Sequence, residues 1–158
     1  VGLGKTHLVH AIGNRIKEMS STKSVLFVSS ERFINQYVDS AKNGNYNDFL
    51  HFYQMIDVLI VDDVQFLAKK EKTQEIFFQI FNYLHQNGKQ LILTSDRAPK
   101  DLKDVDERLL SRFKWGLSAD LQNPDFDTRV SILEQKMYQD GIKFPSEVIE
   151  YVANKVDS

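Results

Sequence analysis

Apolar residues follow two alternating patterns along most of the chain, one with helical spacing and one typical of buried strands. Helical spacing predicts amphipathic helices over 5–19, 31–43, 47–54 and 72–86. Between them, short apolar runs without polar alternation predict strands over 24–29, 58–61 and 90–95. A short helix over 106–113 leads into a last expected strand over 114–119. This alternation predicts a doubly wound α/β fold around a parallel sheet.

The pattern beyond residue 120 is helical only. Asn123 and Pro124 provide a cap and a proline for the first helical position, and Gly141 ends this helix. A second helix is expected to begin near Pro145. We therefore expect a base domain over 1–120 and part of a helical lid over 121–158.

Composition narrows the class of protein. A chain of 158 residues with 42% hydrophobic content can bury one sizeable core, to which we expect Trp115 and the 11 phenylalanines mainly to belong. The absence of cysteine excludes disulfides and thiolate zinc sites, and the apolar runs are too short to span a membrane. We expect a soluble cytoplasmic protein. The net charge of −2 means that any contact with nucleic acid needs a local basic patch.

The chain begins inside a phosphate-binding loop. Its first residues, Val-Gly-Leu-Gly-Lys-Thr, are the last part of a G-x-x-x-x-G-K-[ST] motif whose first glycine is absent. In that motif Lys5 reaches the β- and γ-phosphates, and the hydroxyl of Thr6 binds Mg²⁺. The alternative is a glycine-rich turn that happens to precede a helix.

Two carboxylates stand where the apolar run 58–61 ends. In the P-loop arrangement Asp62 supports Mg²⁺, and the next acid, Asp63, polarises the attacking water. A buried strand that ends in an ordinary polar turn is the alternative. The spacing from Gly4-Lys5-Thr6 fits strand–helix alternation, which favours the nucleotide site.

Several motifs together resemble the AAA+ domain of the DnaA family of bacterial replication initiators. They are Gly-Leu-Gly-Lys-Thr-His-Leu, Ser-Glu-Arg-Phe, Val-Asp-Asp-Val-Gln-Phe, Leu-Thr-Ser-Asp-Arg and Leu-Ser-Arg-Phe-Lys-Trp-Gly, in this order. The resemblance implies a P-loop AAA+ three-layer sandwich with a parallel sheet, lacking the P-loop strand, plus the start of a helical lid. The slot of that strand would lie between 91–95 and 114–119, so we expect this fragment alone to be inactive.

The resemblance implies ATP or ADP and Mg²⁺ as cofactors. Residues implied to bind the nucleotide are Gly2, Gly4, Lys5, Thr6, His7, Asp62 and Arg108, of which Thr6 and Asp62 hold the metal. Asp63 would act in hydrolysis, Asp96 would sense the γ-phosphate, and Arg112 would be an arginine finger that reaches a neighbouring subunit. From the residues alone, Asp96 also fits a turn, and Arg108 and Arg112 also fit a solvated helix surface.

The helices between residues 30 and 54 resemble the insertion of this family. This resemblance implies self-association into a helical filament that holds single-stranded origin DNA. Val38 and Lys72 match the family positions implied to contact that DNA. From the residues alone, Val38 also fits a helical core stripe. Lys69, Lys70 and Lys72 form a basic patch, although a solvated helix start is an alternative.

The expected function is an ATP-dependent replication initiator that oligomerises on origin DNA and helps to open the duplex. Slow ATP hydrolysis, a weak regulatory ATPase activity, would be its off switch. Duplex origin DNA would be bound only through a C-terminal domain outside this chain, and a replicative helicase or regulators are further expected partners. The alternatives are a regulator or helicase loader of the same AAA+ class and a small-molecule P-loop kinase.

Overall fold

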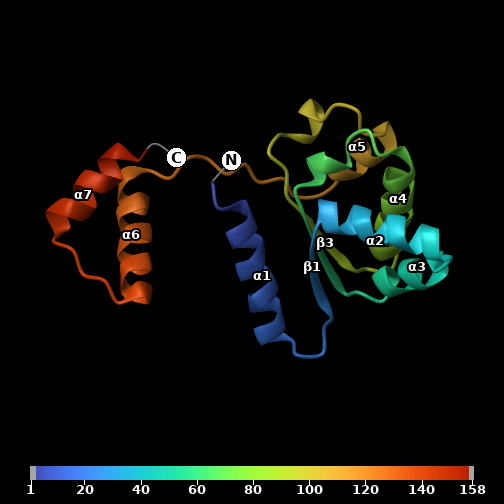
Figure 1. The fold of residues 1–158 in the computed structure, drawn as a ribbon, viewed down its shortest axis with the longest axis horizontal. Helices are drawn as coiled ribbons and strands as arrows, with labels where there is room; N and C mark the ends of the chain where they lie inside the picture. Colours follow the sequence, from blue (N-terminus) through green and yellow to red (C-terminus); the bar gives the residue numbers. More distant parts are fainter. Residues whose placement is uncertain (1–2, 157–158) are drawn as a thin grey trace. The chain divides into compact units, whose positions relative to one another are not determined.

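The computed structural model describes residues 3–156 of the chain (Figure 1). The chain divides into two compact units. One spans Gly4–Ser118 and contains the sheet, and the other contains the helices beyond Ala119.

Three parallel strands form the sheet. They are β1 (Val25–Ser29), β2 (Val58–Asp62) and β3 (Gln90–Leu93), and β2 lies between the other two. Leu59 of β2 lies opposite Leu26 of β1 and Leu91 of β3. Every residue of β2 is buried, as its unbroken apolar run predicts.

Helices cover both faces of the sheet and complete a three-layer sandwich. Helix α1 (Lys5–Met19) lies on one face, where its Val9 packs with Val58 and Ile60. Gly13 lets α1 approach closely, because a Cβ there would come within 3.0 Å of the Ile60 side chain. The other face carries α2 (Ser30–Asn43), α3 (Tyr46–Gln54), α4 (Glu71–Gln86) and α5 (Glu107–Phe113). Two short 3₁₀ helices, η1 (Val64–Leu67) and η2 (Pro99–Asp101), follow β2 and β3.

An aromatic cluster packs helices α2 and α3 against α4 in this core. The fully buried Phe33 of α2 has its ring centroid 5.0 Å from that of Tyr53 in α3 and 5.4 Å from that of Phe77 in α4. The hydroxyl of Tyr53 donates a 2.6 Å hydrogen bond to Gln36, and burial raises the pKa of this phenol. Burying each of these rings stabilises the fold by about 1.5–3 kcal/mol.

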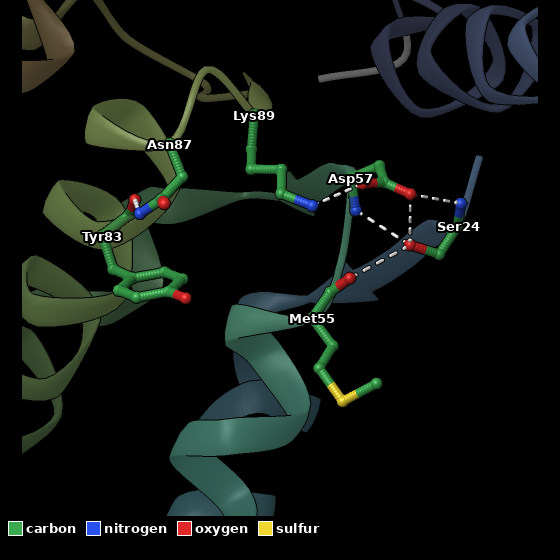
Figure 2. Close-up of polar contacts among 6 residues, drawn as sticks. All are labelled: Ser24, Met55, Asp57, Tyr83, Asn87 and Lys89. Carbon is green, nitrogen blue, oxygen red and sulfur yellow. Dashed lines mark hydrogen bonds and ion pairs between the residues drawn. The ribbon is translucent and has the colours of Figure 1, made fainter.

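The amino-terminal ends of all three strands meet in a polar cluster (Figure 2). The carboxylate of Asp57 accepts hydrogen bonds from the backbone N–H of Ser24 at 2.9 Å and from its hydroxyl at 3.0 Å. Its other oxygen pairs with the ammonium of Lys89. Since these residues immediately precede β1, β2 and β3, the cluster links the starts of the strands.

Most predicted elements are confirmed, but the strand over 114–119 is wrong. No strand occurs there in the described chain, because a strand needs a neighbouring strand for its backbone hydrogen bonds and none lies beside it. Trp115 is also not part of the core, since it is 61% exposed.

The second unit contains α6 (Phe126–Asp140) and α7 (Ser146–Lys155), which pack against each other. Ile149 and Ala153 of α7 are buried. The cap of α6 is Asp125, whose side chain accepts from the N–H of Thr128, so the expected cap at Asn123 is wrong. Pro124 precedes this cap, so the helix begins after it. Within residues 3–156, no helix has the length and apolar character needed to cross a membrane.

Candidate nucleotide site

Helix α1 begins directly after Gly4, within the phosphate-loop motif. Gly4 caps the helix in the left-handed region, with φ at 80°, which glycine adopts without strain. Lys5 is the first helical residue and is half-buried, and His7 is exposed in the first turn. Gly2 lies outside the described residues. The N–H groups at such a helix start are free of helical partners and suit an anion.

The loop and the acidic strand meet through Thr6 and Asp62. The Thr6 hydroxyl donates a 2.7 Å hydrogen bond to Oδ2 of Asp62, although the two residues are 56 positions apart. The other oxygen, Oδ1, accepts a hydrogen bond from the buried hydroxyl of Thr94. The Asp62 carboxylate is therefore held in place from two sides, at the carboxyl end of the central strand.

Asp63 has a strained backbone. Its φ of 58° and ψ of 56° are left-handed, which is uncommon for residues other than glycine, although Asp adopts it more often than most. Two hydrogen bonds hold it there: its N–H donates to Thr94 Oγ1 at 2.9 Å, and its Oδ1 accepts from Gln65 at 3.0 Å. These bonds fix both the backbone of Asp63 and one oxygen of its carboxylate.

Asp96 lies in the exposed segment that follows β3. Its carboxylate forms two hydrogen bonds with the guanidinium of Arg97, at 3.0 and 3.1 Å, which lower its pKa. The positive charge of Lys5 lowers that pKa further, so Asp96 interacts electrostatically with the start of α1. Its backbone N–H donates to Gln65 at 3.4 Å.

The donor set of this site fits a magnesium ion that also binds a nucleotide. Mg²⁺ in phosphate sites uses one or two protein oxygens and completes its shell with phosphates and water. Thr6 and Asp62 provide such a pair. A cluster of three or more His, Asp or Glu side chains, which a purely protein-bound metal would need, is absent from residues 3–156.

Sequence reasoning missed Thr94 and Gln65. Thr94 bonds both to the carboxylate of Asp62 and to the backbone of Asp63, and Gln65 connects Asp63 with Asp96. The only sequence signal for Thr94 is a hydroxyl directly after an apolar run, at the edge where parallel strands end together.

The two arginines of α5 are brought together against α4. Arg108 forms two hydrogen bonds with Asp106, at 3.0 and 2.9 Å, and its guanidinium lies 5.0 Å from the ring centroid of Phe78. Arg112 donates from Nε to the side chain of Asn82 at 2.9 Å. Both guanidinium groups therefore have partners within the chain, although the Arg108 side chain is 61% exposed.

Val38 and Lys72 line the same groove, which has a volume of about 590 Å³. Val38 is 37% exposed, so it is not a core residue of α2. Ile34 and Tyr37 supply the apolar wall of the groove, and the basic residues along it are Lys42, Lys69, Lys70 and Lys72. Glu71 also lines the groove, so four basic side chains and one acidic side chain accompany the apolar residues, and this mainly basic lining suits a single strand of nucleic acid.

Comparison with known proteins identifies the family. Residues 1–120 match the family model described as the bacterial DnaA ATPase domain. Chromosomal replication initiator proteins DnaA from Flavobacterium psychrophilum and Bacteroides fragilis are 62% and 58% identical over 100% and 99% of this chain. The chain spans about a third of the length of these curated relatives, 33% of each.

Solved structures of DnaA proteins also resemble this chain. Domain III of the Thermotoga maritima replication initiation protein DnaA is 43% identical and superposes with a TM-score of 0.97, covering 100% of this chain and 66% of that one. A replication initiator DnaA bound to AMPPCP and single-stranded DNA is 40% identical, with a TM-score of 0.89 over 100% of this chain and 49% of that one. The chain therefore belongs to the bacterial DnaA ATPase domain family.

Proposed function

We propose that this chain is the ATP-binding part of a replication initiator that assembles on origin DNA and helps to open the duplex. Slow ATP hydrolysis would end the active state. The observation that carries the proposal is the contact between Thr6 and Asp62, with the strained Asp63 directly after it. Membership of the DnaA ATPase family and a relative solved with AMPPCP and single-stranded DNA support it.

In this proposal Lys5 binds the β- and γ-phosphates, and the N–H groups at the start of α1 surround them. Thr6 and Asp62 hold Mg²⁺, which when bound neutralises charge on the phosphates. Asp63 orients the attacking water with Oδ2, since Gln65 already binds Oδ1. From the family resemblance, Gly2, Gly4, His7 and Arg108 complete the nucleotide contacts, and Asp96 responds to the γ-phosphate.

Assembly would depend on Arg112, acting on the nucleotide of a neighbouring subunit. Single-stranded DNA would lie along the groove that Val38 and Lys72 line. Both roles connect nucleotide state to DNA opening, because ATP at one subunit would hold the next subunit in place. ATP hydrolysis would therefore limit how long the assembly lasts.

The test is ATP-dependent assembly of the full-length protein, measured by analytical ultracentrifugation beside ATP affinity. We expect Arg112→Ala to keep the ATP affinity of the monomer and to lose assembly. Lys114→Ala, which removes an exposed cation two positions away, is the matched control and should behave as the unmodified protein. If Arg112→Ala strongly reduces ATP binding by the monomer, the placement across a subunit boundary is wrong.

A further inference from the structure

Three side chains of its own subunit contact the guanidinium of Arg112. Its Nε donates to Oδ1 of Asn82 at 2.9 Å. The guanidinium carbon lies 4.8 Å from the ring centroid of Trp115 and 5.8 Å from that of Phe78. Asn82 and Phe78 lie one turn apart on α4, so a single helix face supplies both contacts.

A tight turn after α5 places Trp115 over the arginine. The backbone N–H of Trp115 donates to the carbonyl of Arg112 at 3.0 Å, and Gly116 follows with φ at 106°. The indole ring, although 61% exposed, is thereby kept over the guanidinium. A cation–π contact at this distance orients the plane of the guanidinium.

These contacts leave the outer end of the guanidinium available. Within residues 3–156, the two Nη groups of Arg112 make no hydrogen bond. Arg108 differs, because both its Nε and Nη2 already bind Asp106. Of the two arginines, Arg112 alone therefore presents the pair of donors that binds phosphate oxygens in a bidentate fork.

We propose that Asn82 is a positioning residue for the arginine finger: its amide oxygen holds Nε of Arg112 so that both Nη groups face the neighbouring subunit's nucleotide. This inference rests on the proposed function, in which Arg112 acts across the subunit boundary. Asn82 itself touches no nucleotide. Its effect on catalysis passes entirely through the orientation of Arg112.

The test uses the full-length protein and three substitutions in α4. Asn82→Leu removes the acceptor but keeps the number and branching of the side-chain heavy atoms, Asn82→Asp keeps an oxygen acceptor, and Gln86→Leu removes an exposed amide elsewhere on the same helix. We expect Asn82→Leu to lower assembly-stimulated ATP hydrolysis about tenfold, because small displacements of a catalytic group cost this much or more. ATP affinity of the monomer should not change, and Asn82→Asp and Gln86→Leu should stay within about threefold of the unmodified protein.

A mixing experiment separates positioning from a folding defect. Asp63→Asn subunits bind ATP without hydrolysing it in our proposal, and they carry an intact Arg112. Added in excess, they should restore hydrolysis at the sites of Asn82→Leu subunits, and equally at those of Arg112→Ala subunits. The double variant Asn82→Leu, Arg112→Ala should be no slower than Arg112→Ala alone.

The results test the finger role of Arg112 and the positioning role of Asn82 separately. If mixing fails to rescue Arg112→Ala, the finger role in the proposed function is wrong. If that rescue works but Asn82→Leu hydrolyses ATP normally, the positioning role is wrong. The positioning role is equally overturned if Asn82→Leu slows the Arg112→Ala background further, or if Asn82→Asp loses as much activity as Asn82→Leu.

Discussion

The Thr94 hydroxyl donates a hydrogen bond to the buried carboxylate of Asp62 and so joins the carboxyl ends of β3 and β2. The same oxygen accepts a 2.9 Å hydrogen bond from the N–H of Asp63. One hydroxyl therefore orients the carboxylate proposed to hold the metal and also holds the backbone of the residue proposed to activate water.

We expect Thr94→Val to destabilise the protein and to slow ATP hydrolysis. Valine has the shape of threonine but leaves one oxygen of Asp62 and the N–H of Asp63 without these partners, which costs about 1–3 kcal/mol of unfolding free energy. Urea denaturation measures the loss. Thr94→Ser keeps the hydroxyl and should retain most of the stability. Equal stability of the valine variant and the unmodified protein would refute this role.

We expect Asp63→Asn to separate ATP binding from hydrolysis. Asparagine tolerates the left-handed backbone, so the fold should persist, but it cannot take a proton from water. Loss of a general base lowers the rate by about 10²–10⁴-fold, while ATP affinity should remain nearly unchanged. Single-turnover hydrolysis and titration calorimetry measure the two quantities. Hydrolysis at an unchanged rate would show that Asp63 has no part in activating water.

The pH dependence of stability should reflect Asp57. The hydrogen bond from Lys89, with those from Ser24, lowers the pKa of Asp57 from 3.8 to about 2. A carboxyl group whose pKa is lower in the folded state stabilises the fold above its unfolded pKa, and this contribution disappears as the pH falls through the folded value. The contribution is therefore complete above about pH 4 and disappears between 3.8 and about 2.

Asp57→Asn should accordingly flatten the loss of stability between pH 4 and pH 2, measured by urea denaturation at each pH. Lys89→Met should flatten it partly, because the hydrogen bonds from Ser24 remain. Asp39→Asn, which removes an exposed carboxylate from the interior of α2, is the control and should leave the profile unchanged. A steep profile that persists in Asp57→Asn would assign the acid sensitivity to other groups.

We expect Lys72→Ala to weaken binding of single-stranded DNA and to spare ATP binding. One lost phosphate contact should reduce the slope of log affinity against log salt by about 0.7 for a single strand. Fluorescence anisotropy over a salt series measures both effects. Lys17→Ala, which removes an exposed cation of α1 on the other side of the sheet, should leave affinity and slope unchanged. An unaltered slope in Lys72→Ala would exclude it from the DNA contact.

Local patterns predict the fold where one physical signal dominates. The helix expected over 5–19 is α1 (Lys5–Met19), and the apolar run 58–61 lies within β2. The strand over 114–119 could not be judged in this way, because a strand forms only with a partner and its own residues do not show whether one is present. Trp115 shows a similar limit: its size suggests burial, but its position depends on a turn and on the charge of Arg112.

The sequence predicts the motifs of the candidate site but not the hydrogen bonds that connect its residues. Phosphate-loop and acidic-strand motifs single out Thr6, Asp62 and Asp63, and the structure brings Thr6 and Asp62 into contact. The hydrogen bonds of Thr94 and Gln65 depend on which strands are neighbours and on the path of the chain after each strand. Such information is spread over the whole sheet, so no short motif contains it.

The central strand is connected by side chains to a neighbouring strand at both of its ends. Asp57 pairs with Lys89 just before β2 and β3, and Asp62, the last residue of β2, binds Thr94 just after β3. Sliding β2 along β3 would separate both pairs at once, and a shift of one residue would also exchange the faces of Val58 and Leu59. Two side-chain pairs thus favour the same alignment of these strands, so the ion pair at the amino-terminal end of the sheet helps to keep the site carboxylates at its other end in register.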